Sequence, residues 1–135
     1  MLTKLEAQAN SLYELQDGCF DKQVDLEYLD LSMNQIEDLP DGIFKKLGSL
    51  KVLKLGANLL TMMAPKSLIG LEKLEEISLY GNQLKTIPAQ SLNKLTNLKY
   101  LNLAGNQIKY RLLEICEFRL FLVANYMVSV CNCLF

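Results

Sequence analysis

The sequence predicts an α/β solenoid, a curved stack of short repeats with a parallel β-sheet on its concave face. The segment LKYLNLAGNQI, which begins at Leu98, has related segments at a period of 24 residues, and these begin at Leu74, Leu50, Leu26 and Leu2. Counted from these starts, places 1, 4, 6 and 11 of each unit hold Leu or Ile in nineteen of twenty cases. Because Leu and Ile supply only 36 of the 135 residues, chance does not explain this periodicity.

Each unit predicts one short strand, at the LxL step of places 4 to 6. Apolar and polar residues alternate there, as they do in a strand with one buried face. The expected strands are residues 29–31, 53–55, 77–79 and 101–103, with a further one at 5–7, where Ala7 replaces the second leucine. Parallel pairing between successive strands needs a connection of a dozen or more residues, and every unit supplies one.

The second half of each unit carries further apolar residues, which we expect on the far side of the same core. They are Leu39 and Phe44, Met63 and Leu68, Ile87 and Leu92, followed by Leu47, Leu71 and Leu95. These segments are expected to form irregular or short helical turns on the convex side.

Asparagine occupies place 9 in all five units, at Asn10, Asn34, Asn58, Asn82 and Asn106. The chain turns sharply after each strand, which leaves buried backbone groups without partners in the sheet. An amide side chain offers those groups two donors and an acceptor. We therefore predict a structural ladder of asparagines that links the turns of neighbouring repeats, and no ligand-binding role for them.

The pattern LxxLxLxxNxL resembles the leucine-rich repeat over residues 2–108. The 24-residue unit, the steps Leu39–Pro40 and Ile87–Pro88, and the place of Phe44 are similar to the "typical" class of these repeats. That class is found in Toll-like, chaoptin-like and Slit-like extracellular proteins. The resemblance implies a protein-recognition module from an extracellular receptor or cell-adhesion protein, with a protein ligand or a cell-surface partner.

Two alternatives to this function remain open. The N-terminal segment MLTKLEAQAN has charges where a secretory signal needs an apolar core, and no spacing pairs the cysteines, which suits a cytoplasmic scaffold or adaptor. The chain is also consistent with a truncated product that has no function of its own, because the repeat pattern starts and stops abruptly.

Composition argues against several other functions. The charge is balanced, with 14 basic and 15 acidic residues, so we expect no nucleic-acid partner. The sequence has no histidine, and its cysteines (Cys19, Cys116, Cys131 and Cys133) match no zinc spacing. We therefore expect no metal, no cofactor and no enzymatic activity, since no histidine could activate a serine or cysteine nucleophile.

The sequence divides into repeats over 1–110 and a non-repeat hydrophobic tail over 111–135. Arg111 and Cys116 fall where apolar residues are expected, and residues 120–135 contain no charge. This tail is consistent with a segment that covers the last strand, with a cysteine-bearing cap, with a membrane anchor, or with a partial chain. Membrane association through the tail is the less favoured of these alternatives, because sixteen residues are short for a membrane-spanning helix.

The candidate binding residues point outward from the predicted strands and the turns that follow them. Tyrosine is enriched at protein interfaces, and tyrosines on this face have no evident packing partner in the sequence. Polar and charged residues near the middle of the strands accompany them. The predicted partner-binding residues are Tyr28, Asp30, Lys54, Glu76, Ser78, Tyr80, Tyr100 and Asn102.

Overall fold

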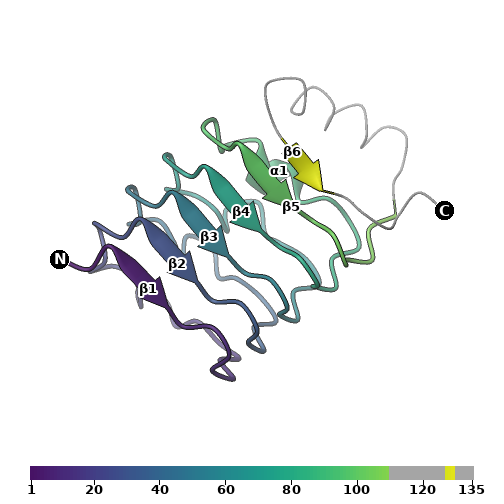
Figure 1. Ribbon diagram of the computed structural model, residues 1–135, viewed down its shortest axis with the longest axis horizontal. Coiled ribbons are helices and arrows are strands. Elements are labelled where there is room, and N and C mark those ends of the chain that lie inside the picture. Colours follow the sequence, from purple (N-terminus) through teal and green to yellow (C-terminus); the bar gives the residue numbers. More distant parts are fainter. Residues whose placement is uncertain (110–126, 130–135) are drawn as a thin grey trace.

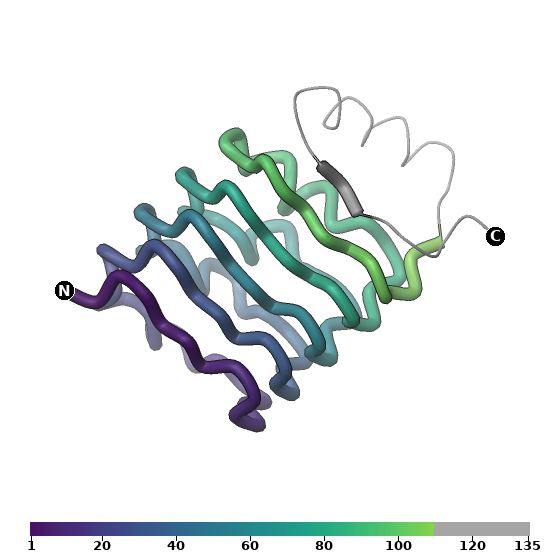
Figure 2. Tube along the Cα trace, viewed as in Figure 1, coloured from purple at the N-terminus to yellow at the C-terminus, as the bar shows by residue number. Residues whose placement is uncertain are grey.

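The computed structural model describes residues 1–109 and the strand Met127–Ser129. Its strands form one parallel sheet in chain order, which confirms the predicted solenoid (Figure 1). The strands are β1 (Lys4–Glu6), β2 (Tyr28–Asp30), β3 (Val52–Lys54), β4 (Glu76–Ser78), β5 (Tyr100–Asn102) and β6 (Met127–Ser129). The return segments run behind the sheet, and one of them contains the short helix α1 (Ala89–Leu92) (Figure 2).

The five strands from β1 to β5 pair in the register of the 24-residue period. Leu5, Leu29, Leu53, Ile77 and Leu101 therefore lie opposite one another along the stack. Each strand begins one residue before the predicted LxL step and covers places 3 to 5. The leucine at place 6 continues the pairing in one direction only; the N–H of Leu55, for example, donates to the carbonyl of Ser78 at 2.8 Å.

The core is a continuous apolar column between the sheet and the return segments. Leu29, Leu53, Phe44 and Leu79 are fully buried. In the first unit, Leu15 and Phe20 are buried as well, and the Phe20 ring packs against Phe44 at a centroid distance of 5.8 Å. The sequence interpretation overlooked these two residues, although they stand at the same places as Leu39 and Phe44. Met63 and Ile87 are only partly buried.

The asparagine side chains bridge neighbouring turns. In Asn82, Nδ2 donates to the carbonyls of Leu55 at 2.9 Å and Leu79 at 3.0 Å, and Oδ1 accepts from the N–H of Leu60 at 3.1 Å. Asn34, Asn58 and Asn106 make the equivalent bonds. Each amide thus satisfies backbone groups of its own unit and of the preceding one, as buried polar groups require.

Asn10 differs from the other four. It is exposed, and its Nδ2 donates only to the carbonyl of Gln8, at 3.1 Å. Its backbone N–H donates to Oδ1 of Asn34 at 3.0 Å, so the backbone of the first unit joins the ladder while the Asn10 side chain reaches no other repeat among the described residues.

Gly70 marks a close approach between the return segments of two units. Its φ is +91°, and a Cβ at this position would lie 2.5 Å from the carbonyl oxygen of Lys45. We expect Gly70→Ala to lower the free energy of unfolding by about 1–3 kcal/mol, because the backbone must shift to relieve the overlap. Gly48→Ala is the matched control, since a Cβ there would meet no atom within 4 Å. Urea denaturation of both variants measures the difference, and equal losses of stability would contradict this packing.

Strand β6 pairs with β5 in a different spacing from the other strands. Met127 lies opposite Tyr100, 27 residues later rather than 24. These three residues cover the edge of β5, as one of the alternatives for the tail predicts. Residues 110–126 and 130–135 lie outside the described residues, and so do Arg111, three of the cysteines, and the alternatives of a cap or a membrane anchor. Within the described part of the chain, no helix has the length and apolar character needed to cross a bilayer.

Candidate binding face

The outward-pointing residues of β1 to β5 form two rows across the sheet, and together with the exposed Tyr80 we call them the concave face. The first row is Lys4, Tyr28, Val52, Glu76 and Tyr100, and the second is Glu6, Asp30, Lys54, Ser78 and Asn102. Seven of the eight predicted binding residues lie in these rows. Tyr80 lies two residues beyond β4, and its side chain is 52% exposed.

Tyr28 has intramolecular partners on this face. The Nζ atoms of Lys4 and Lys54 lie 5.0 Å and 5.6 Å from the centroid of its ring, within the range of cation–π attraction. Its hydroxyl donates to Oδ2 of Asp30 at 3.4 Å. The expectation that the tyrosines lack packing partners is therefore wrong for Tyr28, whose exposure needs no ligand to explain it.

Asp30 and Asn102 both stabilise the turn that follows their strand. Oδ1 of Asp30 accepts from the N–H of Ser32 at 2.9 Å, and Oδ1 of Asn102 accepts from the N–H of Ala104 at 3.0 Å. A short side chain that binds the backbone two residues on is a turn-forming device. These two predicted binding residues therefore have a structural role as well as a place on the concave face.

Lys4 and Glu6 were not among the predicted binding residues, although they occupy the same places in the first unit. The two side chains form an ion pair at 2.7 Å, which raises the pKa of Lys4 through its hydrogen bond to Glu6. This pair closes the N-terminal end of the concave face, next to Tyr28.

A row of alternating charges borders the concave face at place 2. It consists of Glu27, Lys51, Glu75 and Lys99 in successive units. Lys51 pairs with Glu27 at 2.8 Å, and Lys99 pairs with Glu75 at 2.7 Å. The sequence interpretation missed this row, although the period alone would have revealed it. The hydrogen bond to Glu27 raises the pKa of Lys51, and the hydrogen bond from Lys99 lowers the pKa of Glu75.

We expect Lys99→Met to return the pKa of Glu75 toward its ordinary value, because the ammonium group that favours the charged carboxylate is gone. Since folding lowers this pKa, the contribution of Glu75 to stability is present above its unfolded pKa and is lost as pH falls through the folded value. Titration of the Glu75 side chain by NMR measures the shift. An unchanged Glu75 titration in Lys99→Met would show that the pair does not persist in solution.

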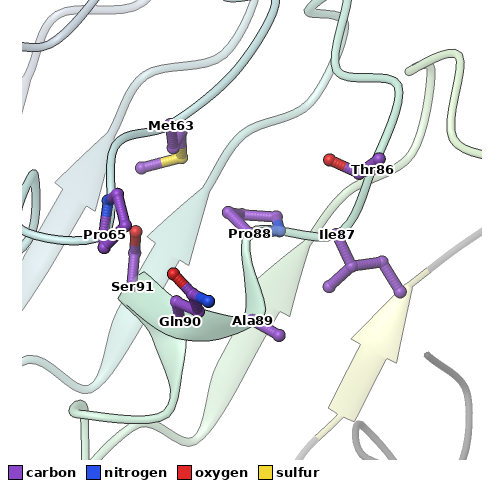
Figure 3. Close-up of a pocket in the computed structure, with 8 residues that line it drawn as sticks. All are labelled: Met63, Pro65, Thr86, Ile87, Pro88, Ala89, Gln90 and Ser91. Atoms are coloured by element: carbon purple, nitrogen blue, oxygen red, sulfur yellow. The ribbon is translucent and has the colours of Figure 1, made fainter. Parts of the chain in front are cut away.

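A separate hollow of about 320 Å³ lies on the return side of the stack, away from the concave face (Figure 3). It is lined by Met63, Pro65, Thr86, Ile87, Pro88, Ala89, Gln90 and Ser91. The Ser91 hydroxyl is already engaged, since it donates to the carbonyl of Ala64 at 2.7 Å. No charged side chain lines this hollow, and none of the predicted binding residues reaches it.

The described residues offer no candidate metal site, because no three acidic or cysteine side chains gather in them. Cys19 carries a free, exposed thiol whose pKa is raised by burial of the sulfur, so the unreactive thiol form is favoured. The concave face is therefore the candidate site, and its chemistry is recognition through charge, aromatic surface and shape.

Comparison with known proteins decides the family. The family model for the leucine-rich repeat matches residues 1–60, 26–84 and 48–108. The chain belongs to the leucine-rich repeat family. A comparison of this leucine-rich repeat chain with curated proteins finds no match.

Among solved structures, this leucine-rich repeat chain is similar to the crystal structure of the leucine-rich repeat domain of APL1B. The TM-score is 0.77 and the sequence identity is 25%. The match covers 81% of this chain and 33% of the other, so the chain spans about a third of the length of that relative. The leucine-rich repeat fold is a typical non-enzymatic scaffold and in general a protein–protein interaction module.

Proposed function

We propose that this leucine-rich repeat chain binds a protein ligand on its concave face, as part of an extracellular receptor or cell-adhesion protein, and catalyses no reaction. The observation that carries the proposal is the composition of that face. In-register rows bring tyrosines, carboxylates, lysines and small polar side chains onto one continuous surface. Such a surface suits recognition by charge and aromatic contact.

Tyr80 is the most exposed aromatic side chain of this surface. A Cβ built on Gly105 in the next unit would lie 3.3 Å from Cε2 of Tyr80, so the ring rests where Gly105 has no side chain. Tyr80 is thereby held against the sheet while 52% of it stays open to a partner. A rigid aromatic side chain of this kind loses little conformational entropy on binding.

The extracellular location is supported by the repeat class that the sequence resembles, with its 24-residue unit and Leu39–Pro40 step. A cytoplasmic scaffold is the second candidate, and the free exposed thiol of Cys19 favours it. Oxidising compartments convert accessible thiols to disulfides, whereas cytoplasmic proteins keep them reduced.

Binding to arrayed extracellular and arrayed cytoplasmic proteins tests both parts of the proposal. We expect partners among the extracellular proteins, and Ser78→Arg should block them by placing a long cation in the middle of the concave face. Thr96→Arg is the matched control, because Thr96 is exposed on a return segment. Partners that bind Ser78→Arg as well as the unmodified chain would refute recognition through the concave face. Partners found only among the cytoplasmic proteins would favour the scaffold function.

A further inference from the structure

Glu76 is a charged residue of the concave face without an ionic partner in the described part of the chain. The ion pairs there join Lys4 to Glu6, Lys51 to Glu27 and Lys99 to Glu75. Lys54 lies diagonally across from Glu76 on the neighbouring strand, but its ammonium group lies 5.6 Å from the ring of Tyr28. The half-buried carboxylate of Glu76 is thus left for a cation from outside residues 1–109.

Comparison of two equivalent tyrosines shows where that cation would fit. Tyr28 and Tyr100 both stand at place 3 of their units. The preceding residue in their row is Lys4 for Tyr28 and Glu76 for Tyr100. The Lys4 ammonium covers the ring of Tyr28 at 5.0 Å, whereas no cation from residues 1–109 covers the ring of Tyr100. Where Tyr28 has its own cation, Tyr100 has a carboxylate able to hold one.

The chemistry of this pair favours a guanidinium group over an ammonium group. A guanidinium is planar, can bind both oxygens of a carboxylate and stacks on an aromatic ring. It is also less strongly hydrated than an ammonium, so less solvation is lost when it leaves water. β4 and β5 are adjacent in the sheet, which places Glu76 and Tyr100 side by side in one row (Figure 1).

We propose that the protein partner of the concave face inserts an arginine side chain between Glu76 and Tyr100, with its guanidinium against the carboxylate and over the ring. This inference rests on the proposed function and specifies the chemistry of the partner. The N-terminal half of the face, where Tyr28 already has two lysines, takes no arginine.

A peptide titration tests the inference without knowledge of the partner. The probe is the blocked tripeptide Gly-Arg-Gly, compared with the same peptide carrying uncharged citrulline, at low ionic strength. We expect the arginine peptide to shift the NMR signals of the Tyr100 ring and the Glu76 side chain saturably, with a dissociation constant of about 10 mM. The citrulline peptide should bind at least about tenfold more weakly, as loss of a charge-assisted bond predicts. The signals of Tyr28 should stay unchanged.

Two matched variants assign the effect to one carboxylate. Glu76→Gln should abolish the saturable shift of Tyr100, and Glu72→Gln, at an exposed position on a return segment, should leave it intact. Equal binding of both peptides, equal shifts at Tyr28 and Tyr100, no saturable shift at all, or equal losses in the two variants would each overturn the inference. A protein partner blocked by Ser78→Arg but indifferent to Glu76→Gln would also overturn it, while leaving the proposed function standing.

Discussion

Leu79→Ala is expected to lower the free energy of unfolding by about 2–5 kcal/mol. Leu79 stands at place 6 of the fourth unit, and its side chain is 0% exposed inside the continuous core. Truncation removes apolar contacts with units on both sides and leaves a cavity, because the backbone on each side is fixed by the sheet. Urea denaturation followed by circular dichroism measures the loss.

Tyr80→Ala is the control for this substitution, since Tyr80 is the next residue and points outward. Its melting temperature should stay close to that of the unmodified chain. A loss below about 1 kcal/mol for Leu79→Ala would contradict the assignment of place 6 to the core. A larger loss for Tyr80→Ala than for Leu79→Ala would mean that the two faces of the sheet are exchanged.

Asn82→Ala is expected to cost at least about 3 kcal/mol, more than the loss of one ordinary hydrogen bond. The substitution removes the partner of three backbone groups, the carbonyls of Leu55 and Leu79 and the N–H of Leu60. Each buried group left without a partner costs about 1–3 kcal/mol. The same denaturation experiment measures this loss.

Asn10→Ala provides a control with the same residue type, the same place in the unit and the same substitution. Because the exposed Asn10 amide bonds only to the carbonyl of Gln8, we expect a change within about 0.5 kcal/mol. Similar costs for Asn82→Ala and Asn10→Ala would show that the amides act within their own turns and do not join neighbouring units.

The period made most of the fold predictable from the sequence. Because parallel strands 24 residues apart pair in phase, the residues that share a place in the unit also share a row in the structure, as Leu29 and Leu53 do. The hydrogen bonds of Asn34, Asn58 and Asn82 follow from the same phase. Leu15 and Phe20 were predictable by the same rule and were missed because the second half of the first unit was not compared with the others.

The partners of individual side chains on the concave face were less predictable. The sequence places Lys54 diagonally between Tyr28 on one strand and Glu76 on the other, and either could attract it. The choice depends on the side-chain rotamer, on the ammonium of Lys4 over the same ring and on the nearby carboxylate of Asp30, none of which is a property of the repeat pattern. For the same reason, the turn-stabilising role of Asp30 became visible only with the geometry of the Ser32 N–H.

The alternating charges at place 2 bear on how the chain avoids assembling its units in the wrong order. In the native order each carboxylate has a lysine in the adjacent unit, as Glu27 has Lys51 and Glu75 has Lys99. A misfolded stack that skipped the unit starting at Leu50 would bring Glu27 beside Glu75, and like charges directly opposite each other repel. Nearly identical repeats invite such skipping, since their leucines and asparagines are interchangeable. The charge row distinguishes odd from even units, and so it disfavours the very error that the regular core cannot detect.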